Sequence, residues 1–332
     1  TCTSQIEADV GYVSYSSTRN VIQSQVPVVA DEKIYFQRDV RVGERDLERR
    51  LIAFDPNTQT EQEIASDIED AAVATAAEGY VVTYRRVGEA SGELTMYEPL
   101  DGTSRDIPIR HRRYPFWVSN YGEPNDFYDS ERLLVQDREG DMHLMDSQNW
   151  VGIGTANFFG ERSHSTRPVL TQAGLAFDAM AEEGGPSDIY EYVAEQDAER
   201  RLTDDGASHR YPYASLDDVF WVSDDAVYRS RRGSAPERIH EGACGPPHAA
   251  GSRAVFGCGV RSGDRSPPLG HSIHVFDGSQ TREVRSFADE TFAFAVRIGA
   301  NGIAWLEYDD PVEFYSEGVI GRVMYMDLGS GQ

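Results

Sequence analysis

The feature that most constrains the fold of this chain is a pattern of short apolar strands and polar turns that recurs along its length. It is clearest in residues 199–228, where four short strand signals are separated by turns rich in Asp, Gly and Ser. Pro212 stands near the start of one strand, where its missing backbone N–H does least harm to a sheet. The pattern predicts an all-β chain built from small antiparallel sheets.

Units of this kind can be aligned seven times within the 332 residues. Each has a first strand, two apolar central strands and a more polar outer strand. The units begin near residues 27, 71, 115, 168, 212, 247 and 292, with a mean step of about 44 residues. Four strands in about 40 to 45 residues is the period of a β-propeller blade, whereas a β-sandwich does not require a constant step.

We therefore predict a seven-bladed β-propeller of four-stranded antiparallel blades; six or eight blades are the alternatives if a weak unit is misread. The seventh unit has almost no chain left for its outer strand, while residues 9–24 carry an unassigned strand signal. We expect this N-terminal strand to close the ring, because closure removes exposed sheet edges. Residues 1–8 are then a tail or anchor segment, and residues 9–332 form a single propeller domain.

Several units share a local sequence pattern in their third strand, and one outer strand ends in Arg-Arg-Leu-Thr. The segments are Leu51–Asp55, Met142–Asp146, Ile189–Tyr190, Glu199–Thr203, Ile273–Asp277 and Met324–Asp327. In them the chain resembles the propeller repeats of the TolB-like proteins of the bacterial periplasm. The resemblance covers almost the whole chain and implies the fold, but propellers serve binding, scaffolding and catalysis alike. The usual Ser-Pro-Asp-Gly turn and a recognisable N-terminal α/β domain are missing, so the partners of TolB are not carried over.

The charge of the chain excludes some classes of partner. Its 56 acidic and 31 basic residues give a net charge of −25, which repels nucleic acid and anionic membrane surfaces. Lys33 is the only lysine, and an acidic composition that favours Arg over Lys is typical of a high-GC genome or of a salty habitat. No apolar run approaches the roughly 18 residues of a transmembrane helix.

The three cysteines predict one disulfide and one candidate lipid site. Cys244 and Cys258 flank a turn near residues 251–252, so antiparallel pairing places them opposite each other and within reach of a bond. A disulfide implies an oxidising compartment; the alternative is two buried thiols. Cys2 precedes a polar Thr-Ser-Gln segment and resembles the lipid-modified cysteine of a bacterial lipoprotein, although Thr1 stands before it.

Motifs of the common enzyme classes are missing from the sequence. It has no G-x-S-x-G nucleophile elbow and no glycine-rich phosphate loop. No C-x-x-C pair indicates a zinc ribbon or a redox centre. We therefore predict no catalytic residue, no metal and no cofactor.

Histidines and arginines gather beside several first strands. In a propeller the first strand is innermost, so the preceding loops converge at one mouth of the central channel. The ligand-binding candidates at this mouth are His111, Arg113, His164, Arg167, His209, Arg210 and His248. Such a collar suits a carboxylate, a sulfated or phosphorylated group, or a metal bound through His. In the alternative interpretation each Arg pairs with an acidic neighbour and each His is solvated.

The predicted function is that of a non-enzymatic interaction or scaffold module in the bacterial periplasm, at the outer membrane or on the extracellular surface. Its partner is expected to be a protein of the envelope or of an extracellular assembly, with membrane contact only through a lipid on Cys2. The candidate contact residues are aromatic, as in many interfaces: Trp117, Tyr121, Phe127, Tyr128 and Trp150. The alternative is a carbohydrate-active or metal-assisted enzyme with its site at the channel mouth, which requires paired carboxylates or three histidines on one ion.

Overall fold

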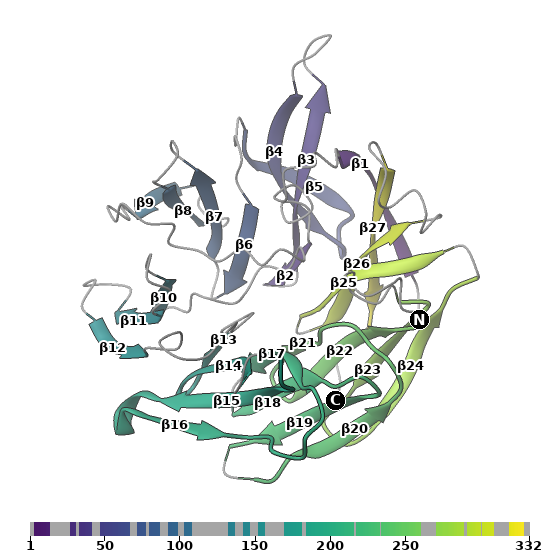
Figure 1. Cartoon of the computed structure of the whole chain (residues 1–332). Coiled ribbons are helices and arrows are strands. Elements are labelled where there is room, and N and C mark those ends of the chain that lie inside the picture. The colour runs from purple at the N-terminus through teal and green to yellow at the C-terminus, as the bar shows by residue number, and fades with distance from the viewer. Residues whose placement is uncertain are drawn as a thin grey trace. The chain divides into compact units, whose positions relative to one another are not determined.

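The computed structural model describes residues 3–13, 27–30, 33–41, 47–66, 72–77, 80–86, 92–98, 103–107, 132–136, 142–146, 152–156, 169–180, 184–215, 217–232, 234–259, 270–288, 291–299, 301–308 and 319–328. These residues form strands and turns, as Figure 1 shows. The short 3-10 helix η2 spans Ala194–Gln196. The prediction of an all-β chain is confirmed. Within the described ranges, no helix is long and apolar enough to cross a membrane.

The chain divides into two compact units. One consists of Thr1–Arg112, Val118–Pro124 and Phe287–Gln332, and the other of Arg113–Trp117 and Asn125–Ser286.

In its described residues, the first unit contains three four-stranded sheets. One sheet consists of β2 (Val28–Ala30), β3 (Lys33–Arg41), β4 (Leu47–Asp55) and β5 (Thr60–Ala65). The next consists of β6 (Ala72–Ala77), β7 (Tyr80–Arg86), β8 (Gly92–Glu98) and β9 (Thr103–Ile107). The third has the order β1 (Thr3–Val13), β27 (Val319–Asp327), β26 (Gly302–Tyr308) and β25 (Phe292–Ile298).

The N-terminal strand completes the last sheet, as the sequence predicted. Strand β1 pairs antiparallel with β27, from Thr3 opposite Met326 to Val13 opposite Val319. The strand begins at Thr3, inside the segment 1–8 that the sequence assigned to a tail. Residues 3–9 are mostly polar, and an outer strand tolerates polar side chains, so hydrophobic alternation does not reveal this part of the strand.

The second unit contains one three-stranded and three four-stranded sheets in its described residues. The three-stranded sheet is β10 (Arg132–Gln136), β11 (Met142–Asp146) and β12 (Gly152–Ala156). The next is β13 (Val169–Thr171), β14 (Gly174–Met180), β15 (Ser187–Val193) and β16 (Ala198–Arg201). It is followed by β17 (Arg210–Ser215), β18 (Asp218–Val222), β19 (Ala226–Arg231) and β20 (Glu237–Glu241), and then by β21 (His248–Ala250), β22 (Arg253–Cys258), β23 (Ser272–Phe276) and β24 (Thr281–Ser286).

The first strands of successive sheets are neighbours in space within each unit. Strand β17 contacts both β13 and β21 in the second unit, and β2 contacts both β6 and β25 in the first. These strands begin within two residues of the six corresponding starts that the sequence predicted. The seventh, predicted at residues 114–118, lies outside the described residues. Strand β12 was not predicted, because its Gly-rich sequence has little apolar alternation.

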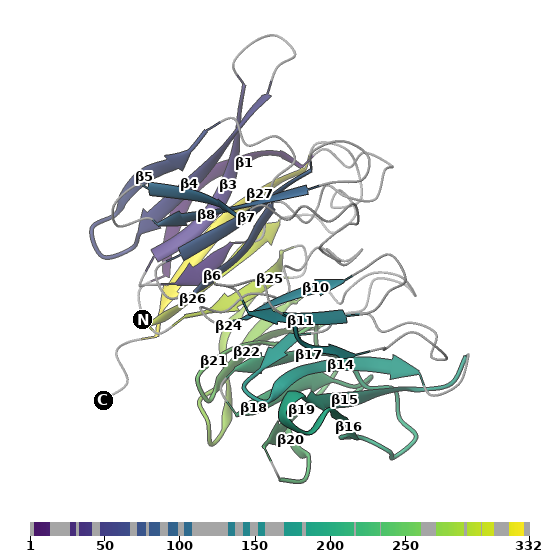
Figure 2. The same cartoon turned by 90° about the vertical axis from the view of Figure 1, so that its left-hand side faces the viewer.

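Burial falls from the central strands to the outer strand of a sheet. All five residues of β18 are buried, as are six of the seven in β14, whereas all four residues of β16 are exposed. Figure 2 shows β14, β15 and β16 in succession across their sheet. One apolar cluster joins this sheet to the next, and its buried members are Val169, Ala176, Ile189, Ala214, Val219 and Trp221. Strands covered on both faces therefore carry continuous apolar runs.

We predict that Trp221→Ala lowers the free energy of unfolding by about 3 to 5 kcal/mol, because the indole is completely buried in this cluster. Urea unfolding followed by circular dichroism measures the change. Arg238→Ala, on the exposed outer strand β20, is the control and is expected to stay within about 0.5 kcal/mol of the parent. Equal unfolding midpoints for Trp221→Ala and the parent would contradict this assignment of the core.

Candidate functional site

The loop from β16 to β17 is held by a hydrogen-bonded chain of three side chains. The Trp221 indole Nε1 donates to His209 Nδ1 at 3.0 Å, and His209 Nε2 lies 2.9 Å from Asp205 Oδ1. Because Nδ1 accepts, Nε2 carries the ring hydrogen and donates to the carboxylate. The His209 side chain is only 1% exposed, and its backbone N–H donates to Ser187 O at 2.7 Å. His209 thus joins the loop to two neighbouring sheets.

The Arg-Arg-Leu-Thr segment has a structural role at the edge of the preceding sheet. Arg201 forms an ion pair with the buried Asp188 at 2.5 Å, and Thr203 Oγ1 donates to the same carboxylate at 3.0 Å. The Thr203 hydroxyl also accepts the backbone N–H of Ile189. Arg200 forms a second ion pair, with Glu191 on β15. The repeat signature therefore reflects how an outer strand is fastened to its neighbour.

A buried ion pair lies within the sheet β17–β20, and its arginine also contacts the next sheet. The Asp218 carboxylate lies 2.7 Å from Arg229 Nη2 and 3.2 Å from Arg231 Nε. Arg229 also donates to Gly278 O at 3.4 Å, and its guanidinium lies 5.3 Å from the centre of the Phe276 ring. The carboxylate and the cation compensate each other inside the fold, where either charge alone is costly.

The structure describes three of the seven predicted collar residues. Besides His209, these are His248, whose Nε2 lies 2.9 Å from Tyr213 Oη, and Arg210, whose Nε donates to Ser208 Oγ at 3.0 Å. His209 and His248 are buried and bonded to different partners, and only Arg210 is exposed. His111, Arg113, His164 and Arg167 lie outside the described residues. So do the predicted contact residues Trp117, Tyr121, Phe127, Tyr128 and Trp150, and the candidate lipid site Cys2.

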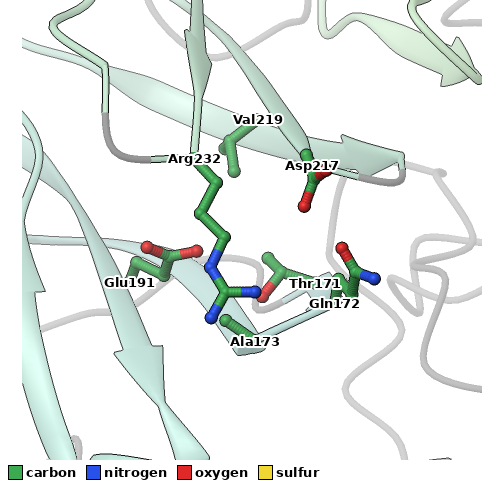
Figure 3. Close-up of a pocket in the computed structure, with 7 residues that line it drawn as sticks. All are labelled: Thr171, Gln172, Ala173, Glu191, Asp217, Val219 and Arg232. Atoms are coloured by element: carbon green, nitrogen blue, oxygen red, sulfur yellow. The ribbon is translucent and has the colours of Figure 1, made fainter.

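A small surface depression lies where the β13–β14 and β17–β18 turns meet. Figure 3 shows the guanidinium of Arg232 extending over Thr171–Ala173 toward Glu191. The remaining lining residues are Asp217 and Val219, and the Arg232 backbone N–H donates to Asp217 O at 2.8 Å. The space is about 170 Å³ including open solvent, below the usual range of ligand pockets. The depression is therefore too small to enclose a ligand of the usual size.

The predicted disulfide is confirmed, and the alternative of two buried thiols is wrong. Cys244 and Cys258 form an isolated antiparallel bridge, with a Cα–Cα distance of 4.0 Å and an S–S bond of 2.05 Å. Two histidines that the sequence did not single out as a site, His240 and His274, lie beside it. One ligand atom of each and Cys258 Sγ all lie within 4.8 Å of one another. Among the described residues, one group of potential metal ligands therefore lies at the disulfide.

No protein-family model and no curated protein matches the chain. Among solved structures, the β-propeller domain of the Trilobed protease from Pyrococcus furiosus matches with a TM-score of 0.59 and 10% identity, over 92% of this chain and 94% of that one. Acylaminoacyl peptidase from Pyrococcus horikoshii matches with a TM-score of 0.58 and 9% identity, over 92% of this chain and 51% of that one. The chain thus spans about half the length of this peptidase.

A chain of a mitotic checkpoint complex matches with a TM-score of 0.53 and 11% identity, over 91% of this chain and 87% of that one. At these identities the matches show the fold alone, and it is that of the β-propeller proteins. TolB from Acinetobacter baumannii also matches, with 12% identity over 86% of this chain and 61% of that one, at a TM-score of only 0.44. The β-propeller fold that the resemblance implied is confirmed by the match to the propeller domain of the Trilobed protease.

We predict that Asp205→Asn makes the protein less sensitive to acid. The hydrogen bonds from His209 and from the Ala207 N–H hold the pKa of Asp205 below its ordinary value of 3.8. The stability from this lowered pKa is present above the ordinary value and is lost as the pH falls through the folded-state value. Because the carboxylate is 57% exposed, the contribution is below about 1 kcal/mol.

Urea unfolding between about pH 6 and pH 3 measures this dependence. Relative to the parent, Asp205→Asn is expected to be less stable near neutral pH and to lose less stability in acid. Asp204→Asn, on the adjacent exposed carboxylate, keeps the bond to His209 and is the control. A parent-like slope in Asp205→Asn would contradict the prediction.

We predict that the double change Cys244→Ser and Cys258→Ser lowers the free energy of unfolding by about 3 kcal/mol, because the bond closes a loop with a sequence separation of 14. Urea unfolding measures the loss. Alkylation of the unreduced, unfolded protein provides the control and is expected to label Cys2 alone. Labelling of all three cysteines would contradict the disulfide.

Proposed function

We propose that this chain is a seven-bladed β-propeller, closed by β1, that acts outside the reducing cytoplasm as a non-enzymatic interaction module. The observation that carries the proposal is the use of its buried polar side chains. His209, Arg229 and Asp188 each bind neighbours within the fold and so hold loops and sheets in place. Such a scaffold presents loops of fixed geometry, which lowers the entropic cost of binding a partner.

The Cys244–Cys258 disulfide supports the location in this proposal. Disulfides persist in oxidising compartments such as the bacterial periplasm and the cell exterior, and are rare in the cytosol. We propose the periplasm, the outer membrane or the extracellular surface of a bacterium. A lipid on Cys2 would then hold the propeller at a membrane that its net charge of −25 otherwise disfavours.

The charge of the chain supports a partner with a basic surface. Opposite charge accelerates association and disfavours wrong partners, and its effect decreases as salt screens it. Aromatic side chains are common in the centres of interfaces, which supports Trp117, Tyr128 and Trp150 as the anchors of the contact. The likeness to a chain of a mitotic checkpoint complex agrees with a role of this fold in assemblies.

A second candidate function follows from the two peptidase matches. The chain covers 94% of the β-propeller domain of one protease and about half of another peptidase. It would then act as the propeller of a peptidase whose catalytic part is a separate subunit. This candidate predicts that the companion of the chain has peptidase activity.

We predict that the affinity-tagged chain retains one stoichiometric protein partner from the cell envelope of its source. Binding is expected to weaken at high salt, and to weaken about tenfold or more in Trp117→Ala or Trp150→Ala. Arg238→Ala on outer strand β20 is the control and is expected to bind like the parent. Surface plasmon resonance of the purified pair measures the affinities.

The identity of the companion separates the two candidates. A partner without hydrolytic activity supports the interaction module, and a partner that cleaves peptides supports the second candidate. If no companion is retained after chemical cross-linking in intact cells, both are wrong.

A further inference from the structure

The region around the disulfide brings together four potential metal ligands from two adjacent sheets. His240 lies on β20, Cys258 ends β22, and His274 lies on β23. Cys244 follows β20 and is bonded to Cys258. The ligand atoms of His240, Cys258 and His274 lie within 4.8 Å of one another.

The two imidazoles are oriented by ring packing, and that of His274 also by a hydrogen bond. Their ring centres lie 4.5 Å apart, and the Phe256 ring lies 5.3 Å from His240 and 6.0 Å from His274. His274 Nε2 lies 2.9 Å from Ser272 Oγ, and the Glu283 carboxylate is 3.9 Å away. Partners of this kind hold the ring of a ligating histidine in a fixed orientation.

The surroundings of both rings shift their pKa values. Burial lowers the pKa of His240, although the nearby Glu241 opposes this shift. Burial also lowers the pKa of His274, with a further lowering from His240, while Glu283 raises it.

The oxidation state of the cysteines decides how many ligands the cluster offers. In the disulfide, both sulfurs are bonded to each other and only the two imidazoles remain. After reduction, the two thiols and two imidazoles make the Cys₂His₂ set of tetrahedral zinc sites. Zinc bonds of about 2.0 to 2.3 Å place such ligand atoms roughly 3.3 to 3.8 Å apart. Side-chain rotations can bring groups within 4.8 Å to these distances.

We propose that reduction of the Cys244–Cys258 disulfide opens a binding site for Zn²⁺ or a similar divalent transition-metal ion, formed by Cys244, Cys258, His240 and His274. A dithiol supplies two electrons and two protons, breaks the S–S bond and is itself oxidised to a disulfide. The ion then displaces one proton from each cysteine thiol and binds both thiolates and both imidazoles. The same two segments of chain remain joined in either state, by a covalent bond or by the metal. This proposal is independent of the protein partner proposed above.

Co²⁺ tests the site directly, because tetrahedral Co²⁺ has visible absorption bands and its thiolate bonds add a charge-transfer band in the near ultraviolet. All proteins carry Cys2→Ser, so that Cys244 and Cys258 are the only thiols. The parent is reduced with dithiothreitol, freed of the reductant without air and titrated with Co²⁺. We expect one Co²⁺ per chain with both kinds of band, and displacement of Co²⁺ by Zn²⁺. The oxidised protein is expected to lack the charge-transfer band.

Single changes test which histidines bind the ion. His240→Ala and His274→Ala are each expected to weaken Co²⁺ binding about tenfold or more. His271→Ala is the matched control, because His271 is partly buried nearby but is not part of the cluster, and it is expected to bind like the parent. If reduction alone unfolds the protein, the metal is expected to restore the native circular dichroism spectrum.

The proposal is overturned by any of four results. The first is that the reduced protein shows no charge-transfer band with Co²⁺, and the second is that both His240→Ala and His274→Ala bind Co²⁺ like the parent. The third is that His271→Ala loses as much Co²⁺ affinity as the two histidine variants of the cluster. The fourth is that reduction unfolds the protein and the metal does not refold it.

Discussion

The packing of neighbouring sheets against the central strands is the constraint on which the rest of this structure depends. Strands such as β18 are buried on both faces, so they need continuous apolar runs, and the outer strand β16 is left to polar residues. Each sheet has too little apolar surface to be stable alone, and the sheet-to-sheet contact supplies the remainder. This dependence explains why the sequence repeats the same order of apolar central strands and polar outer strands.

Several buried polar groups complete this packing through hydrogen bonds. Trp221, His209 and Asp205 form one chain of hydrogen bonds from the core to the surface, and Arg229 reaches from one sheet to a turn of the next. Each of these hydrogen bonds stabilises the fold, because a polar group left unpaired in such a core would lower the free energy of unfolding. The loops are thereby fixed on a rigid base, which is the property that the proposed interaction function requires.

Much of the fold was predictable because it follows from local patterns. The first strands, the pairing of β1 with β27 and the disulfide all depend on strand length, apolar content or symmetry about a turn, which can be counted along the chain. The cluster of His240 and His274 with the disulfide was not predictable in this way. His240 belongs to one sheet and His274 to the next, and no spacing along the sequence indicates that adjacent sheets bring them together. Similarly, the sequence placed His209 beside a first strand, but only the structure shows its bonds to an indole and a carboxylate.

The sequence by itself determined the all-β class and the mean period of the repeat. It also determined that Cys244 and Cys258 lie opposite each other. These properties reside in the order of apolar and polar residues within a few tens of positions. Only the tertiary structure decided which polar side chains form hydrogen bonds within the fold and which lie close enough together to bind one ion. That decision depends on contacts between strands of different sheets, and these arise from packing in three dimensions, which a linear pattern does not specify.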